Sequence, residues 1–197
     1  MKKTALVITG YQNDIFHYNG KINPFIKDVA YQQEALECTF SLLMTHILNF
    51  DYVLSIPFIY NDEIRKVDNP LGLFKWVADT KAFEKGSYGA EELDFLSTFG
   101  ELIHSIPCGF GLSIFSNPEV ERVLKRNKIE QLFFIGACSA LTIDSSGQEA
   151  NLKGYQVTIF SDCFSATSLI EKNHYCEKLF PKFSDVTDSL TYFNSRS

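Results

Sequence analysis

Residues 131–163 read QLFFIGACSALTIDSSGQEANLKGYQVTIFSDC, and this stretch decides the fold. An apolar run at 132–135 ends at Gly136, and the pattern that follows predicts a helix as far as Gly154. A second apolar-rich run, 155–160, comes directly after it. Strand, helix and strand within about thirty residues form one βαβ unit, whose two strands lie parallel. Since ligands of such sheets bind where strands end and helices begin, the turn at 136–142 is the first candidate for a site.

The same alternation of strands and helices extends over the rest of the chain. Further strands are predicted at 5–9, 52–56, 102–106 and 185–187, and further helices at 24–47, 71–78, 118–124 and 166–180. Two helices are expected to begin at Asn-Pro pairs, Asn23-Pro24 and Asn117-Pro118, with Asn as the cap and Pro at the first helical position. The apolar face of the first helix is predicted to include Val29, Phe40 and Leu43.

These elements predict a single three-layer α/β/α domain over residues 1–197, with a doubly wound parallel sheet of six strands. The connection at 58–99 is long for such a fold. Connections of this length are usually functional or carry structure of their own, so we expect it to form a lid or a partner surface.

Composition excludes several classes of function. The chain carries 18 basic and 24 acidic residues, a net charge of −6, and no cluster of Lys and Arg, so nucleic-acid binding is not expected. No apolar stretch approaches the roughly 18 residues of a membrane helix, and the first residues lack the pattern of a signal peptide. The five cysteines are scattered, which favours reduced thiols over a disulfide framework or a zinc site. We therefore expect a cytoplasmic protein.

Several short stretches, taken together, resemble one family. They are residues 5–8 (ALVI), 12–16 (QNDIF), 86–91 (GSYGAE), 136–139 (GACS) and 154–162 (GYQVTIFSD), and they span almost the whole chain. In this order they are similar to the isochorismatase-like, or cysteine hydrolase, superfamily, which includes nicotinamidases and N-carbamoyl amidohydrolases. The resemblance implies a six-stranded parallel sheet flanked by helices, in agreement with the pattern above.

The resemblance also implies a catalytic aspartate after the first strand, a lysine after the third and a nucleophilic cysteine at the start of the helix after the fourth. A helix N-terminus suits this cysteine because it lowers the pKa of a thiol. Counting from the neighbouring motifs, these three positions hold Gly10, Gly109 and Thr142 here. The expected triad is therefore absent from the sequence.

Replacement of a buried aspartate and lysine by glycine predicts a neutral, wider cavity that binds an apolar or planar small molecule. The candidate ligand-binding residues are Asp14, Phe16, Phe110, Phe115, Cys138 and Ser139. For Asp14 the favoured role is a structural one, in which its carboxylate accepts backbone N–H groups of its own loop, and a role in the pocket is the alternative. Relatives with a metal hold it on Asp and His residues after the second strand, where residues 57–62 offer one Asp and no His. Neither a metal nor a cofactor is expected.

The leading hypothesis is a non-catalytic member of this superfamily that binds a small molecule or a protein partner. The alternative is a hydrolase of a small amide or ester with rearranged machinery, in which Cys138, Cys108 or Thr142 attacks the substrate. A scaffold that acts only through self-association is a third hypothesis, because relatives commonly form homo-oligomers.

Overall fold

This computed structural model describes residues 2–60, 68–108 and 111–195. Within that part of the chain, the sheet has six parallel strands. Their order across the sheet is β3-β2-β1-β4-β5-β6. The chain therefore builds outward from β1 in one direction, returns to the middle, and builds outward from β4 in the other. The strands are β1 (Thr4–Thr9), β2 (Tyr52–Ile56), β3 (His104–Ser105), β4 (Gln131–Gly136), β5 (Gln156–Phe164) and β6 (Asp185–Thr187).

The two central strands are buried on both faces. Residues 5–8 of β1 have no exposed surface, and every residue of β4 is buried. Continuous apolar runs of this kind are typical of parallel strands covered by helices on both sides. The apolar runs at 5–9 and 132–135 therefore correctly predicted two strands of the doubly wound sheet.

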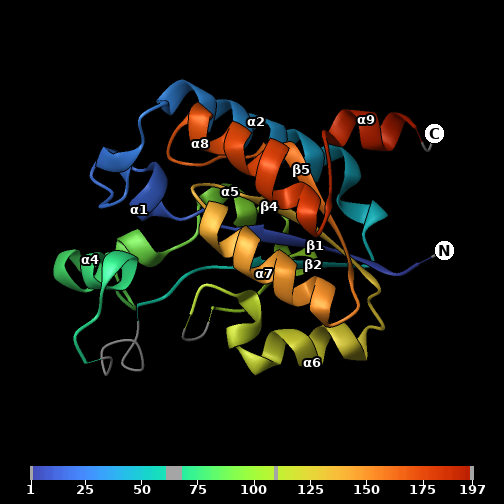
Figure 1. Ribbon diagram of the computed structural model, residues 1–197, viewed down its shortest axis with the longest axis horizontal. Helices are drawn as coiled ribbons and strands as arrows, with labels where there is room; N and C mark the ends of the chain where they lie inside the picture. Colours follow the sequence, from blue (N-terminus) through green and yellow to red (C-terminus); the bar gives the residue numbers. More distant parts are fainter. Residues whose placement is uncertain (1, 61–67, 109–110, 196–197) are drawn as a thin grey trace.

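Helices cover both faces of the sheet (Figure 1). The helix α2 and the last helix, α9, pack on one face with Leu43, Phe133 and Phe160, while α6 and α7 pack on the other with Leu124 and Ile143. The helices are α1 (Asn13–Phe16), α2 (Val29–His46), α4 (Gly72–Thr80), α5 (Asp94–Ser97), α6 (Pro118–Arg126), α7 (Ala140–Leu152), α8 (Leu169–His174) and α9 (Ser189–Asn194).

The start of the first long helix differs from the prediction. Asn23-Pro24 begins only a 3-10 turn, Asn23–Phe25, and α2 starts at Val29. The chain is extended at Ile26 between the two, so the Asn-Pro signal is satisfied by the short turn. The second signal of this type was correct, because Asn117 caps α6 by accepting the N–H of Glu119 at 3.0 Å.

The predicted buried face of this helix was also partly wrong. Val29 and Phe40 are 58% and 44% exposed, whereas Leu43 is fully buried as expected. The helix buries two polar residues instead, Gln32 and Thr39. Thr39 is accommodated because its hydroxyl forms a hydrogen bond of 2.5 Å with the hydroxyl of Tyr11 on the strand side.

The third strand is shorter than predicted and β5 is longer. Leu102 belongs to a 3-10 turn, Gly100–Leu102, because its N–H donates to the carbonyl of Phe99 instead of to the sheet. Only His104 and Ser105 pair with β2, at the exposed edge of the sheet. Short edge strands of this kind limit pairing with other chains.

Candidate functional site

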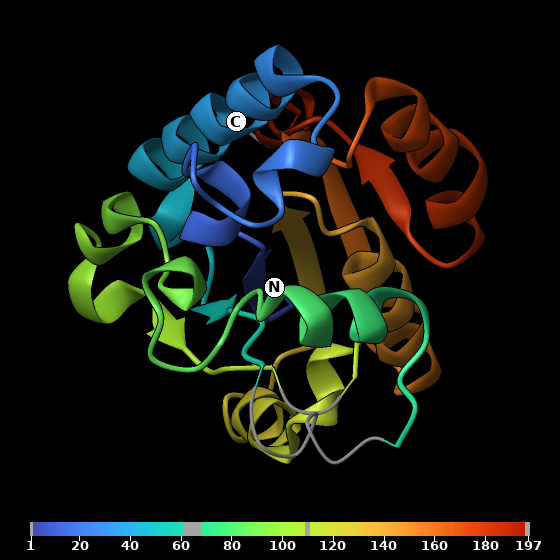
Figure 2. The same ribbon diagram turned by 90° about the vertical axis from the view of Figure 1, so that its left-hand side faces the viewer.

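A cavity of about 350 Å³ lies at the carboxyl ends of β1, β2 and β4. Since the strand order reverses between β1 and β4, this is the place where ligands bind in open α/β sheets. Figure 2 looks onto this end of the molecule, with α4 in front. The lining comes from Thr9, Gly10, Gln12, Ile15, Ile22, Phe25, Ile56, Phe58, Gly72, Leu73, Trp76, Val77, Phe83, Cys108, Leu112, Ala137, Cys138, Ser139, Thr142 and Thr167.

Gly10, one of the three positions that counting from the motifs singled out, lines the cavity. Its φ is +77°, in the left-handed region that favours glycine. A Cβ atom built on Gly10 would overlap the carbonyl oxygen of Ala137, the residue after β4. The backbone of the neighbouring strand end therefore fills the space that a side chain at position 10 would need.

The N-terminal turn of α7 contributes Ser139 and Thr142. Thr142, where counting from the motifs predicted the nucleophile position, is half-buried and lines the cavity. Ser139 precedes the helix, but its hydroxyl does not cap it. That hydroxyl is buried, and a Cβ at Gly136 would overlap it, so it lies against the end of β4.

Cys138 lies directly before this turn and also lines the cavity. Its backbone is left-handed, with φ of 49°, and its N–H donates to the hydroxyl of Ser165 at 3.2 Å. Burial, with a smaller contribution from the carboxylate of Glu171, raises the pKa of the Cys138 thiol to about 12. The thiol is therefore protonated at neutral pH, whereas only a thiolate is a good nucleophile.

Cys108 belongs to the wall on the side of β3. Its thiol is buried and lies 3.5 Å from the carbonyl oxygens of Gly111 and Ser113 and 3.4 Å from the hydroxyl of Ser116. These partners belong to the turn that follows, so the sulfur helps to hold that turn. Gly109, predicted to replace a lysine, and Phe110, predicted to bind the ligand, lie outside the described residues.

Asp14 and Phe16, both predicted to bind the ligand, are not part of the lining. The buried Asp14 carboxylate accepts the backbone N–H of Lys21 at 3.0 Å and of Phe83 at 2.5 Å. This is the structural role that the sequence favoured for Asp14. Phe16 stacks on Tyr11, with ring centroids 5.7 Å apart.

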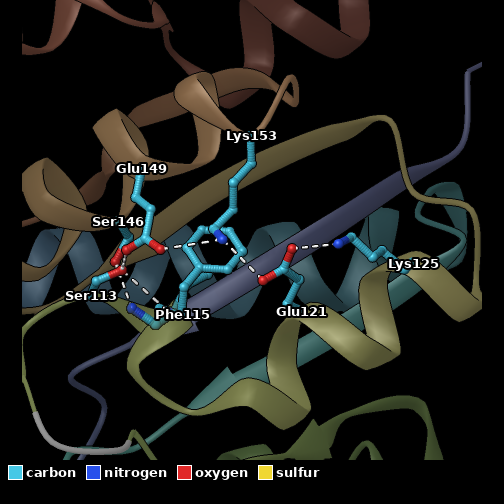
Figure 3. Close-up of polar contacts among 8 residues, drawn as sticks. Ser113, Phe115, Glu121, Lys125, Ser146, Glu149 and Lys153 are labelled. Atoms are coloured by element: carbon cyan, nitrogen blue, oxygen red, sulfur yellow. Dashed lines mark hydrogen bonds and ion pairs between the residues drawn. The ribbon is translucent and has the colours of Figure 1, made fainter.

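Phe115, also predicted to bind the ligand, is not part of the lining. Its side chain lies against that of Lys153 (Figure 3). Its ring stacks on Tyr155 with centroids 6.1 Å apart, and the ammonium of Lys153 lies 5.2 Å from the ring centre. Lys153 also joins two carboxylates, at 2.9 Å to Glu121 on α6 and 3.5 Å to Glu149 on α7. The aromatic ring is therefore part of the contact between α6 and α7.

Four aromatic residues of the lining were not predicted. Phe25 and Trp76 contact edge to face, with ring centroids 4.8 Å apart, and so do Phe58 and Phe83 at 5.5 Å. Three of the four belong to the long connection at 58–99, which was singled out in the sequence as a segment only. Its length was the available signal, because no periodicity indicates which of its side chains turn inward.

No Asp, Glu, Lys, Arg or His is found among the described residues that line the cavity. Gln12, the largest polar side chain there, uses its amide within the protein: it donates to the carbonyls of Phe58 and Ala90 and accepts the N–H of Phe58. Within residues 2–60, 68–108 and 111–195, no group of three His, Cys, Asp or Glu side chains could hold a metal ion. No helix in that same part of the chain is long and apolar enough to cross a membrane.

Comparison with known proteins places the chain in a family. The model of the isochorismatase domain matches residues 4–190. Among solved structures, an isochorismatase family protein from Desulfovibrio vulgaris is similar with a TM-score of 0.77 and 16% identity, over 100% of this chain and 98% of that one. Nicotinamidase from Bacillus subtilis has a TM-score of 0.69 and 19% identity, over 94% and 99% of the two chains.

N-carbamoylsarcosine amidase from Thermoplasma acidophilum is similar with a TM-score of 0.67 and 17% identity, over 95% and 92% of the two chains. No curated protein sequence matches. At these identities the solved structures show a shared fold, six parallel strands flanked by helices, and the family model covers nearly all of the sequence. The chain belongs to the isochorismatase family.

Proposed function

We propose that this protein binds an uncharged, mostly apolar small molecule in the cavity at the carboxyl edge of the sheet, and that it does not hydrolyse that molecule. The observation that carries the proposal is the lining itself, which among the described residues offers no charged side chain and no imidazole. A charged ligand would lose its hydration there without gaining a partner. A neutral apolar ligand gains the contact of aromatic and aliphatic side chains.

The aromatic residues favour a flat ligand. Two aromatic pairs in edge-to-face contact, Phe25–Trp76 and Phe58–Phe83, line the same cavity. Aromatic rings stack on planar groups and contact them edge to face with favourable energy beyond simple burial. The volume of about 350 Å³ is at the lower end of the range for small-molecule sites, which is suitable for a ligand of up to about three rings.

Absence of catalysis is supported at two triad positions. Gly10 cannot act as a base, and an aspartate side chain there would overlap Ala137. A threonine hydroxyl needs an adjacent base to attack, and no carboxylate or imidazole lines the described part of the cavity beside Thr142. The raised pKa of Cys138 argues against that thiol as a substitute nucleophile.

Ligand binding can be measured with N-phenyl-1-naphthylamine, an uncharged aromatic probe that carries a planar naphthalene ring. Trp76 is the only tryptophan of the chain and lines the cavity, so its emission should be quenched saturably. The anionic probe 8-anilinonaphthalene-1-sulfonate should bind roughly tenfold more weakly, since its sulfonate finds no partner. Thr142→Phe should fill the cavity and abolish quenching, whereas Thr45→Phe on the exposed face of α2 should not. Quenching that does not saturate, or binding to Thr142→Phe that equals binding to the wild type, would contradict the proposal.

The hydrolase alternative makes a different prediction. An active Cys138 would react with iodoacetamide at pH 7.5 faster than free cysteine, whereas the raised pKa predicts slow reaction that accelerates about tenfold per pH unit up to pH 11. Mass spectrometry of the peptide that contains Cys138 gives the rate. The names of the two amidase neighbours make nicotinamide and N-carbamoylsarcosine the first substrates to test. If the wild type turns over either substrate and Thr142→Val or Cys138→Ser abolishes this turnover, the hydrolase alternative is established instead.

A further inference from the structure

A second cavity, of about 860 Å³, lies at the opposite end of the sheet from the first. It borders residues with which strands begin: Thr4 of β1, Gln131 of β4 and Gln156 of β5. In Figure 1 the start of the chain and α9 both lie at the right, and residues of both segments line this cavity. The proposed function does not involve it.

One wall of this cavity is aromatic. Phe50 and Phe133 are 8% and 1% exposed, and their ring centroids lie 5.4 Å apart. Two residues of α9 pack on them, with centroids 5.1 Å apart for Phe133 and Tyr192 and 6.1 Å apart for Phe50 and Phe193. His46, the last residue of α2, stacks parallel on Phe193 at 3.9 Å. Rings that hold one another in place form a wall on which a flat ligand can pack.

The rim of the cavity carries positive charge. Lys2 and Lys3 are exposed and border the cavity. Among the described residues, neither ammonium group forms an ion pair or a hydrogen bond, and the imidazole of His46 has no hydrogen-bond partner. Asp51 is the single carboxylate of the lining within that part of the chain, and it accepts the N–H of Thr4 at 2.9 Å. Two cations are therefore left without an anion, in a chain whose net charge is −6.

The two cavities differ in the ligand that they can accept. The first offers no charged side chain among the described residues, so an anion loses its hydration there without gaining a partner. The second combines an aromatic wall with unpaired ammonium groups. Hydrogen bonds between an ammonium and a carboxylate are stronger than those between neutral groups. A molecule with a flat ring and one carboxylate satisfies both parts of this lining at once.

We propose that the cavity at the amino ends of the strands is a second binding site, which takes a small aromatic carboxylate. The ring of the ligand lies against Phe50, Phe133 and the two aromatic residues of α9, and its carboxylate lies beside Lys2 and Lys3. This site is separate from the one at the carboxyl edge of the sheet, and occupation of one does not require occupation of the other.

The probe for this site is 2-naphthoate, and the readout is the imidazole resonances of His46 in protein that contains isotope-labelled histidine. The resonances that are missing from His46→Gln identify them. Addition of 2-naphthoate should shift these resonances saturably, because the ring of the probe packs beside His46. The uncharged 2-naphthylmethanol should need about tenfold higher concentrations to do so, since it has no carboxylate for Lys2 and Lys3.

The double variant Lys2→Gln/Lys3→Gln removes both charges at exposed positions, so the fold should not change. It should bind 2-naphthoate about tenfold more weakly, and added salt should weaken binding by the wild type toward the same affinity. Lys27→Gln/Lys85→Gln is the matched control, because it removes two exposed lysines that each follow a lining residue of the first cavity by two positions. Its affinity for 2-naphthoate should equal that of the wild type.

Unshifted His46 resonances, equal affinities for the two compounds, or equal affinities of Lys2→Gln/Lys3→Gln and the wild type would overturn the second site. The proposed function is judged separately, because quenching of Trp76 by N-phenyl-1-naphthylamine reports on the first cavity. The anion 2-naphthoate should not displace that probe. Displacement of the probe with unshifted His46 resonances would place the anion in the first cavity and contradict both proposals.

Discussion

At the scale of single residues, the ends of β1 and β4 approach each other so closely that two glycines are required. A Cβ on Gly10 would overlap Ala137, and a Cβ on Gly136 would overlap the hydroxyls of Thr9 and Ser139. Thr142 is different, since it is half-buried on a helix and borders an open space. A cysteine side chain would fit at position 142 without rearrangement, but an aspartate at position 10 would first need the backbone to move.

Gly10→Ala should therefore be markedly destabilising. Gly154 offers a matched control, because its φ of +90° is also left-handed but a Cβ there meets nothing within 4 Å. Gly154→Ala should lower the free energy of unfolding by about 1 kcal/mol, the cost of left-handed backbone alone. Gly10→Ala should lower it by about 3 kcal/mol, because the overlap adds to that cost. Equal losses in urea denaturation would contradict the close approach of the two strand ends.

At the scale of elements, α7 holds the turn that follows β3. The N–H of Ile114 donates to the hydroxyl of Ser146 at 3.0 Å, and the hydroxyl of Ser113 donates to the carboxylate of Glu149 at 2.6 Å (Figure 3). Glu149 is in turn paired with Lys153. Since the carbonyl of Ser113 lies beside the Cys108 thiol, these contacts also position a wall of the cavity.

Ser146→Ala tests this attachment. The substitution would leave the buried N–H of Ile114 without its acceptor, and an unsatisfied buried donor costs about 1–3 kcal/mol. Ser145→Ala, at the half-buried neighbouring position of the same helix, should change the free energy of unfolding by less than about 0.5 kcal/mol. Thermal or urea unfolding of both variants gives the comparison. A loss at Ser145 equal to that at Ser146 would mean that the hydrogen bond to the turn contributes nothing.

At the scale of the whole molecule, the sequence was sufficient for the order of strands and helices but not for the walls of the cavity. Apolar runs and Asn-Pro pairs act locally, so β1, β4, β5 and the cap of α6 could be read from them. The lining residues Trp76 and Phe83 are brought together by the path of a long connection, which no local pattern specifies. Phe115 was misplaced for the same reason: its position in the chain is next to the cavity, but its ring turns toward α6.

Because several thiols and a tyrosine hydroxyl are buried, the stability of the whole molecule depends on pH in the alkaline range. Burial raises the pKa values of the Cys138 and Cys163 thiols and of the Tyr11 hydroxyl, so these groups keep their protons in the folded state. In the unfolded chain a thiol loses its proton near pH 8.5. The unfolded state therefore binds fewer protons above that pH, and the free energy of unfolding falls as pH rises further.

Urea denaturation at pH 7, 8.5 and 10 under reducing conditions measures this dependence. The free energy of unfolding should be nearly constant between pH 7 and 8. The fully buried Cys163 alone should lower it by about 2 kcal/mol by pH 10, because its thiol keeps its proton in the folded protein and loses it in the unfolded chain. Deprotonation of surface lysines also acts in this range, so Cys163→Ala supplies the comparison. Whatever its stability at pH 7, this variant should lose less free energy of unfolding between pH 8.5 and 10 than the wild type. If the free energies of unfolding of the two proteins fall in parallel with pH, the Cys163 thiol ionises as easily in the folded protein as in the unfolded chain.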